Sequence, residues 1–324
     1  ITIQNMLTGP ASGGGVATYQ GLNNTFSNLY FYKVNTQGTG ADFYLTEETG
    51  AQWSNIRSRE GSFGPECVRC TSLDAVNVSS WNATGRALKV TGLVHSKMTN
   101  VEASRSSATG FSIQGGSYDN IITGLKALGN TGSLGWGFHS DGDGNIYNQY
   151  VGLQLWGNNG QSGGGVSNDA VFGSNGGYCD THNFIQGVSF NASDPANSFV
   201  YDQAYGSCAA APSGNVISYN DSWTRVTSTA GAVTCNSANC HVTTEALTTA
   251  AGTAYILTVT GNRLGVSVVN AAVHLTNQGT NTGGALVLAS ATANSGTLVV
   301  VIYNLGSSAL NGTLQLDIST VVGS

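Results

Sequence analysis

Short apolar runs, separated by turn residues, recur along the first two thirds of the chain. Each repeat has a small or polar residue, then Asn or Asp, then an apolar residue that opens a short segment. The Asn or Asp positions are Asn28, Asn55, Asp74, Asn100, Asn120, Asn145, Asn183 and Asn215. A second apolar segment precedes most of them, as in ALKVTGL, GFSIQGG and GWGFHSDG. No window keeps the i, i+3, i+4, i+7 apolar spacing of a helix, so the pattern predicts at least two short strands per repeat.

A repeat of this length that holds strands and no helix is typical of a β-solenoid. Stacked coils place like strands on like strands and bury an inner column of side chains that one coil alone leaves exposed. We therefore predict an all-β fold with a right-handed parallel β-helix over residues 1–225. The two longest gaps, 145–183 and 183–215, are expected to hold lateral loops or one extra coil.

The recurring Asn has a physical reason, because Asn is one of the few residues other than Gly that adopts the left-handed region at low cost. Stacked Asn side chains also hydrogen-bond along a column. One set is expected at equivalent corners along one edge: Asn100, Asn120, Asn145, Asn183 and Asn215. An Asn-rich chain produces some such pairs by chance, and this alternative stays open.

The chain changes character after residue 225. Between 226 and 324 the charged residues are Glu245, Arg263 and Asp317, and apolar strands alternate with Gly, Asn and Ser. Strands at roughly ten-residue spacing favour a β-sandwich. We expect a connector over 226–242 and the sandwich over 243–324. So little charge favours burial of this surface against copies of the same chain.

Composition argues against two classes of protein, those that bind nucleic acid and those that insert into a membrane. Charged residues make up 9% of the 324 residues, the formal charge is −6, and no basic run occurs, so a nucleic-acid partner is not expected. Nor is membrane insertion, because no apolar run approaches the ~20 residues of a spanning helix.

Six cysteines allow several pairings. Proximity favours Cys235–Cys240, and Cys67–Cys70 and Cys179–Cys208 then follow, although buried thiols remain an alternative. The five histidines lack zinc-site spacing, so no cofactor is expected.

The segment GWGFHSDGDGNIY is the best candidate for chemistry. If Phe138 points inward, strand alternation places His139 and Asp141 outward. The similar segment SFVYDQ then places Asp202 outward in the same column, two ladder steps or ~10 Å from Asp141. Inverting glycosidases separate their acid and base by a similar distance. We therefore assign Asp141 and Asp202 as the candidate acid and base, with His139 beside them.

Several neighbours in the sequence are candidate sugar ligands. The rings of Trp136, Tyr147 and Trp156 are expected to stack on sugar rings. Asp180 and His182, on the intervening corner, are expected to join them.

Two other interpretations of this segment stay open. DGDG is ordinary turn chemistry and is compatible with a solvated turn. Asp141, Asp143 and Asn145 match the first ligands of an EF-type calcium loop, but Ile146 and Gly152 stand where that loop needs its Gly and its bidentate Glu.

The ending TAYILTVTGNRLGVSVV, followed by GTLVVVIYNLGSSALNGTLQLDI, resembles the small C-terminal β-domains of phage tail proteins. An Asn-cornered β-helix before such a domain is similar to the bacteriophage tailspike and tail-fibre group. The resemblance implies an extracellular homotrimer on the virion, joined to other tail components, that binds and often cleaves bacterial surface polysaccharide. Six cysteines depart from the group, because its members fold in the reducing bacterial cytoplasm.

Three functions follow from these observations: a polysaccharide depolymerase, a non-catalytic receptor-binding fibre, and a structural filament or virion decoration protein. For the enzyme, glycoside hydrolysis is favoured over lyase chemistry, because a lyase needs a cation beside the scissile uronate and no basic cluster is present.

Overall fold

The computed structural model consists of strands and turns, without helices in the residues it describes. These residues are 2–4, 15–34, 40–132, 134–141, 144–162, 166–168, 170–172, 174–175, 178–190, 200–202, 215–219, 224–261, 269–277, 279–294 and 297–323. A helix long and apolar enough to span a bilayer is therefore absent from this described part. The chain divides into two compact units, Ile1–Asn215 and Val216–Ser324.

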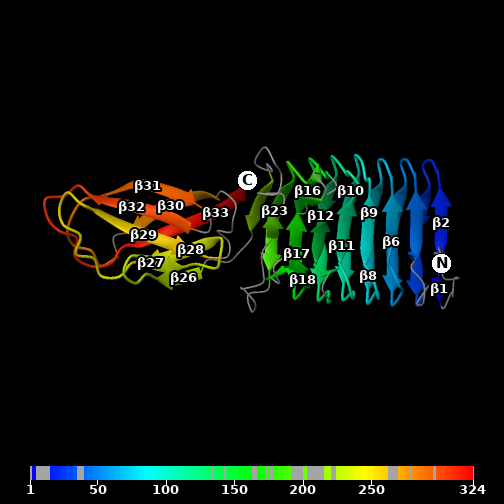
Figure 1. Ribbon diagram of the computed structural model, residues 1–324, viewed down its shortest axis with the longest axis horizontal. Helices are drawn as coiled ribbons and strands as arrows, with labels where there is room; N and C mark the ends of the chain where they lie inside the picture. Colours follow the sequence, from blue (N-terminus) through cyan, green and yellow to red (C-terminus); the bar gives the residue numbers. More distant parts are fainter. Residues whose placement is uncertain are drawn as a thin grey trace. The chain divides into compact units, whose positions relative to one another are not determined.

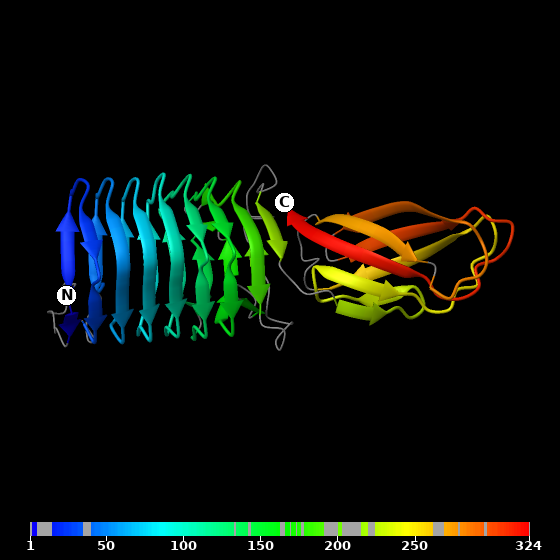
Figure 2. The same cartoon turned by 180° about the vertical axis from the view of Figure 1, so that it is seen from behind.

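Two long parallel sheets form the first unit, and their strands stack side by side in sequence order (Figures 1 and 2). The first sheet contains β1 (Thr2–Gln4), β4 (Tyr30–Tyr32), β6 (Gln52–Arg59), β8 (Asp74–Trp81), β10 (Lys97–Ser104), β12 (Ile121–Thr123), β16 (Gln149–Val151) and β23 (Phe184–Phe190), flanked by β3 (Thr25–Ser27), β13 (Lys126–Leu128) and β17 (Gln154–Trp156). The second contains β2 (Val16–Tyr19), β5 (Phe43–Thr46), β7 (Glu66–Val68), β9 (Leu88–Thr91), β11 (Phe111–Gln114), β15 (Phe138–Ser140), β20 (Ala170–Phe172) and β24 (Val200–Asp202). Successive coils supply strands to both sheets, which confirms the predicted parallel β-helix.

The longest gap in the repeat holds a lateral insertion. Within it, β18 (Asn159–Ser162) and β19 (Val166–Asn168) form a small antiparallel sheet with β14 (Leu134–Gly135), which precedes the gap, and β21 (Ser174–Asn175) pairs with β22 (Tyr178–Cys179). The coil strand β20 lies between these two insertions in the sequence. The sequence left either a lateral loop or an extra coil open for this gap, and β18, β19, β21 and β22 lie outside the two long sheets.

Inward side chains form continuous columns along the stack. One buried column, set by the register of the first sheet, contains Trp53, Ala75, Met98, Ile122, Tyr150 and Ile185. Aromatic rings also meet across the interior: the ring centroids of Phe111 and Phe138 are 6.2 Å apart, and those of Phe138 and Tyr150 are 4.7 Å apart. Because inward and outward positions alternate along each strand, the outward residues are the ones that can meet a ligand.

One Asn column lies on the outside of a corner. Asn28, Asn55, Asn77 and Asn100 have φ between 54° and 57°, and the side-chain amides of the last three each donate to the Oδ1 of the preceding Asn at 3.0–3.2 Å. This is the predicted left-handed Asn corner. In it Asn77, and not Asp74, occupies the third position, so the sequence-based assignment of Asp74 was wrong by three residues.

A second Asn column is buried and serves a different purpose. The Nδ2 groups of Asn120, Asn148 and Asn183 donate to the Oδ1 of the next Asn up the column at 2.8, 3.0 and 3.2 Å, ending at Asn215. Asn145 belongs to neither column, because its Oδ1 accepts the backbone N–H of Ser117 at 2.9 Å. The prediction of a single Asn column was therefore wrong. Each coil has several corners where Asn is needed: at some corners Asn adopts the left-handed backbone, and at others its side chain satisfies buried backbone groups.

The second unit contains two further groups of strands. One joins β25 (Val216–Tyr219), β26 (Thr224–Thr227), β28 (Asn239–Thr243), β30 (Val269–Asn277) and β33 (Gln315–Gly323). The other joins β27 (Ala232–Thr234), β29 (Ala254–Thr260), β31 (Leu286–Asn294) and β32 (Thr297–Asn304). Because β25 and β26 pair with β33 and β28, the second unit begins about ten residues before the predicted boundary at 225/226.

Two of the predicted disulfides are present. Cys67 is bonded to Cys70, and Cys235 is bonded to Cys240. The predicted Cys179–Cys208 pair involves Cys208, which lies outside the described residues.

Candidate functional site

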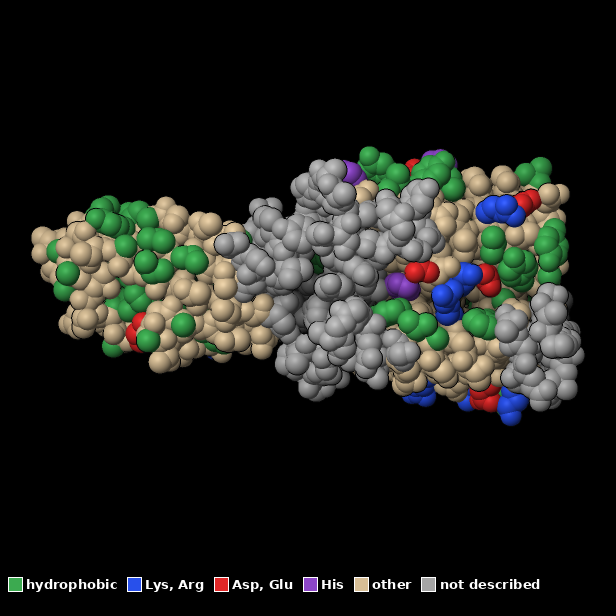
Figure 3. Space-filling view, viewed as in Figure 1, with side chains coloured by type: hydrophobic (Ala, Val, Ile, Leu, Met, Phe, Trp, Pro, Cys, Tyr) green, Lys and Arg blue, Asp and Glu red, His purple; other side chains and the backbone are tan. Residues whose placement is uncertain are grey.

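His139 and Asp141 lie on the outer face of the second sheet, as predicted. Phe138 and Ser140 on either side of His139 are fully buried, so alternation directs the imidazole outward. His139 Nε2 is 3.6 Å from Asp141 Oδ1, and the side-chain amide of Gln114 donates to Asp141 Oδ2. Figure 3 shows a histidine side chain next to acidic and basic side chains on the surface of the first unit.

The surroundings of His139 keep it neutral. Burial, and secondly the positive charge of Arg86, lower the pKa of His139 to about 4. The Trp136 ring covers it, with ring centroids 4.4 Å apart. A neutral imidazole can hydrogen-bond a ligand with one ring nitrogen as donor and the other as acceptor, but a pKa this far below 7 makes it a weak proton acceptor.

The register brings Asp202 to a different position from the predicted one. Ser140 pairs with Phe172, and Phe172 pairs with Asp202, so two ladder steps connect Asp202 to Ser140 and not to Asp141. The backbone of Asp202 is therefore one residue out of register with the expected carboxylate pair. The predicted common column of Asp141 and Asp202 was wrong, and the Asp202 side chain lies outside the described residues.

The five predicted sugar ligands do not share one surface. Trp136 is 7% exposed, and Asp180 is fully buried where its Oδ1 accepts the backbone N–H of Asn145 at 2.8 Å. Tyr147 and His182 lie on another corner, with ring centroids 5.3 Å apart. Trp156, 43% exposed, ends β17 on the first sheet. Of these side chains, only Trp136 lies beside the His139–Asp141 pair.

The calcium-loop interpretation is not supported by Asn145. Its amide oxygen accepts the Ser117 N–H, and its amide nitrogen donates to Ile113 O and Ser140 Oγ at 3.3 and 3.2 Å. These bonds occupy the group that would have to bind the ion. Asp143 lies outside the described residues, and within the described ones no cluster of three potential metal ligands occurs.

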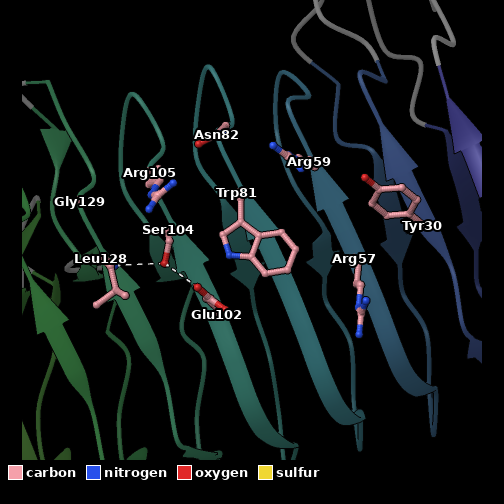
Figure 4. A pocket seen from close by; sticks show the side chains of 10 residues that line it. All are labelled: Tyr30, Arg57, Arg59, Trp81, Asn82, Glu102, Ser104, Arg105, Leu128 and Gly129. Atoms are coloured by element: carbon pink, nitrogen blue, oxygen red, sulfur yellow. Dashed lines mark hydrogen bonds between the residues drawn. The ribbon is translucent and has the colours of Figure 1, made fainter.

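A groove on the outer face of the first sheet was not predicted from the sequence. It has a volume of about 730 Å³ and is formed by the outward ends of neighbouring coils. Its lining residues are Tyr30, Arg57, Arg59, Trp81, Asn82, Glu102, Ser104, Arg105, Leu128 and Gly129. Figure 4 shows Trp81 in the middle, with Arg57 and Arg59 to one side and Glu102 and Arg105 to the other.

Strand alternation places these side chains in the groove. In β6 the buried Ser58 separates outward Arg57 from outward Arg59, and register continues the Arg59 position to Trp81 on β8. The Ser104 hydroxyl links two neighbouring coils by accepting the Leu128 N–H at 3.3 Å and donating to Glu102 Oε1 at 3.4 Å. An aromatic platform, guanidinium donors and one carboxylate therefore lie on rigid strands, an arrangement that suits a sugar chain.

The signal for this groove was present in the sequence but dispersed. The segments YFY, IRSRE, SSWN and EASRS each carry outward polar or aromatic residues at alternate positions. They come from four coils spread over about 75 residues, so only the register between coils shows that they share a surface.

No family model matches the sequence, and no curated protein sequence does. Eighteen chains of solved structures match, and many of the similar structures are phage tailspikes.

Three of these structures illustrate the similarity. The tailspike gp61 of Pseudomonas phage phi297 is 11% identical, with a TM-score of 0.34 over 92% of this chain and 66% of that chain. The A-module of the mannuronan C-5 epimerase AlgE4 of Azotobacter vinelandii is 15% identical, with a TM-score of 0.38 over 62% of this chain and 75% of that chain. The Gp54 tailspike of Acinetobacter baumannii bacteriophage AP22, solved with a capsular saccharide, is 9% identical, with a TM-score of 0.33 over 93% of this chain and 68% of that chain.

Proposed function

We propose that the protein binds bacterial surface polysaccharide in the groove around Trp81, as an extracellular fibre or tailspike of a phage virion. The observation that carries the proposal is the groove itself: an indole and a phenol ring, from Trp81 and Tyr30, set among hydrogen-bonding groups on a rigid sheet. Sugar rings pair apolar faces with hydroxyl edges, so stacking and hydrogen bonding in one groove complement them.

Binding to bacterial capsule and O-antigen preparations tests this proposal. Trp81→Ala removes the central platform and is expected to weaken binding by about tenfold, equivalent to ~1.4 kcal/mol of lost packing. Tyr147→Asn is the matched control. It removes an exposed ring on another corner, and Asn tolerates the left-handed backbone at this residue (φ 56°). Equal loss in both variants, or loss in the control alone, would refute the assignment to the groove.

Cleavage is a second candidate function, favoured by the neutral imidazole of His139 beside Asp141. A hydrolase needs two carboxyl groups, and Glu102 is the one carboxyl group that lines the groove. We therefore assign cleavage to the second sheet, away from the groove, with Asp141 as one of the two carboxyl groups.

The same polysaccharides, assayed for products, test this assignment. New reducing ends that disappear in Asp141→Asn would support hydrolysis, whereas unsaturated products would indicate a lyase. Binding without products would identify a non-catalytic receptor-binding fibre. If the assays show neither binding nor products, the remaining function is that of a structural filament or decoration protein.

We infer that the second unit is a β-sandwich and that it joins three copies of the chain into a homotrimer. We also infer that the solenoid is right-handed and that the trimer is attached to virion tail components. Alternating burial in β28 and β32 supports two sheets that face one core. On the opposite side of β29 and β32, Ile256 pairs with Val301 and no charged residue is present on either strand. An uncharged apolar sheet face suits contact with another copy.

A further inference from the structure

We infer that the groove around Trp81 selects carboxylated polysaccharides, with Arg57, Arg59 and Arg105 as the residues that bind the acidic groups. This inference rests on the proposed function, because it names the class of sugar that the same groove takes.

The distribution of charge supports this selectivity. The chain has 11 Lys and Arg residues and a formal charge of −6. Nevertheless, three arginines line this one groove and Glu102 is its one acidic residue, so the lining carries a local charge of +2. An acidic polymer therefore meets a positive surface on a protein that otherwise repels it.

The arginines are available to a ligand. Among the residues whose side chains the structure describes, Arg57 and Arg105 form no ion pair, and both are exposed. Arg59 Nε lies 3.2 Å from Glu60 Oε1, but Lys33 Nζ also approaches Glu60, at 3.7 Å. One carboxylate is thus shared between two cations, and Arg59 keeps guanidinium N–H donors free for a ligand.

The spacing of the arginines suits a chain that lies along the stack of coils. Arg59 ends β6 and is two ladder steps from Ser104, the residue before Arg105, so the two arginines lie on coils ~10 Å apart along the stacking direction. Trp81 on β8 occupies the coil between them. A sugar ring stacked on Trp81 therefore presents its neighbours in the chain to an arginine on either side.

Arginine also specifies the type of acidic group. Its planar guanidinium binds a carboxylate through two parallel hydrogen bonds, which a hydroxyl or an N-acetyl group cannot reproduce. Uronic-acid and nonulosonic-acid sugars carry such carboxylates at fixed positions along the polymer.

Carboxyl reduction provides the test on the full chain. Each bacterial polysaccharide is assayed by titration before and after its carboxyl groups are converted to hydroxymethyl groups, which keeps the sugar rings and removes the charge. We expect the acidic form to bind about tenfold more tightly than its reduced form, and the preference to weaken with added salt. The triple variant R57Q/R59Q/R105Q should lose this preference while it keeps the affinity of the reduced form.

The control is Arg69→Gln, which removes an exposed arginine outside the groove, paired with Glu47 at 2.6 Å. It should leave both affinities unchanged. Equal binding of the acidic and reduced polymers, or a triple variant that still prefers the acidic form, would overturn the inference and leave the proposed function intact. Equally tight binding of a single-stranded oligonucleotide would also overturn it, because the groove would then respond to charge alone. If neither polymer form binds, the proposed function fails together with the inference.

Discussion

The buried column of asparagines should be a main source of stability, and Asn183 allows this to be measured. The Asn183 side chain is 1% exposed. Its Oδ1 accepts the backbone N–H and the side-chain amide of Asn148, both at 3.0 Å, and its Nδ2 donates to Asn145 O at 2.9 Å and to Asn215 Oδ1 at 3.2 Å. Every polar atom of this side chain is thus satisfied by a neighbouring coil.

Asn183→Leu keeps the approximate volume of the side chain and removes all four bonds. Two buried N–H groups of Asn148, one on the backbone and one on the side-chain amide, then lose their acceptor, whereas Asn145 O still accepts the Thr181 N–H at 3.1 Å. An unsatisfied buried group costs about 1–3 kcal/mol, so the free energy of unfolding should fall by roughly 2–6 kcal/mol. This is a large part of the ~5–15 kcal/mol that stabilises a typical domain.

Asn77→Gly is the matched control in the exposed column. Asn77 has φ 57°, which Gly adopts without cost, and its two side-chain bonds, at 3.0 and 3.2 Å, are open to water. We expect a loss of about 1 kcal/mol or less, because water replaces the lost partners. Urea unfolding, followed by tryptophan fluorescence, measures both values. Similar losses in the two variants would refute the reasoning, since burial would then make no difference to the column.

The remaining predictions concern pH and assembly. Burial raises the pKa of Asp42 from 3.8 to about 7, so the folded state holds the proton more tightly and Asp42 should weaken folding as pH rises from about 4 through 7, by up to ~4 kcal/mol. Asp42→Asn should flatten this slope in urea unfolding at pH 5 and pH 8, and an unchanged slope would contradict the burial argument. Ile256→Asp places a charge on the apolar face of β29, where Ile256 is 55% exposed, and should convert a trimer into monomers in sedimentation velocity. Thr243→Asp, on the other sheet, should not, and a wild-type monomer would refute the assembly.

Local patterns were sufficient for the architecture. Turn residues at intervals and the absence of helical spacing predicted the parallel β-helix, because stacking is the way such short strands bury one face. The alternation through Phe138, His139 and Ser140 also predicted which side chains face outward. The formation of short strands and the direction of their side chains both depend on the two-residue period of a strand, and this period is visible in the sequence.

The register between coils was decided by the tertiary structure. Repeats of unequal length can be aligned on several Asn positions, and a shift of a few residues exchanges Asp74 for Asn77 without changing the local pattern. The same uncertainty placed Asp202 level with Asp141, whereas hydrogen bonding sets it level with Ser140. A shift of one residue reverses which side chain faces out, so catalytic pairs drawn across coils are sensitive to it.

The sequence by itself determined that this chain forms a solenoid of short strands followed by a nearly uncharged β unit. The tertiary structure alone decided where a ligand can bind. Tyr30, Arg57, Trp81 and Arg105 come from separate coils, and nothing in the spacing of any one coil distinguishes them from ordinary surface residues. They become a groove because coil stacking brings each one within a few ångströms of the next, at the ~4.8 Å repeat of the strand ladder.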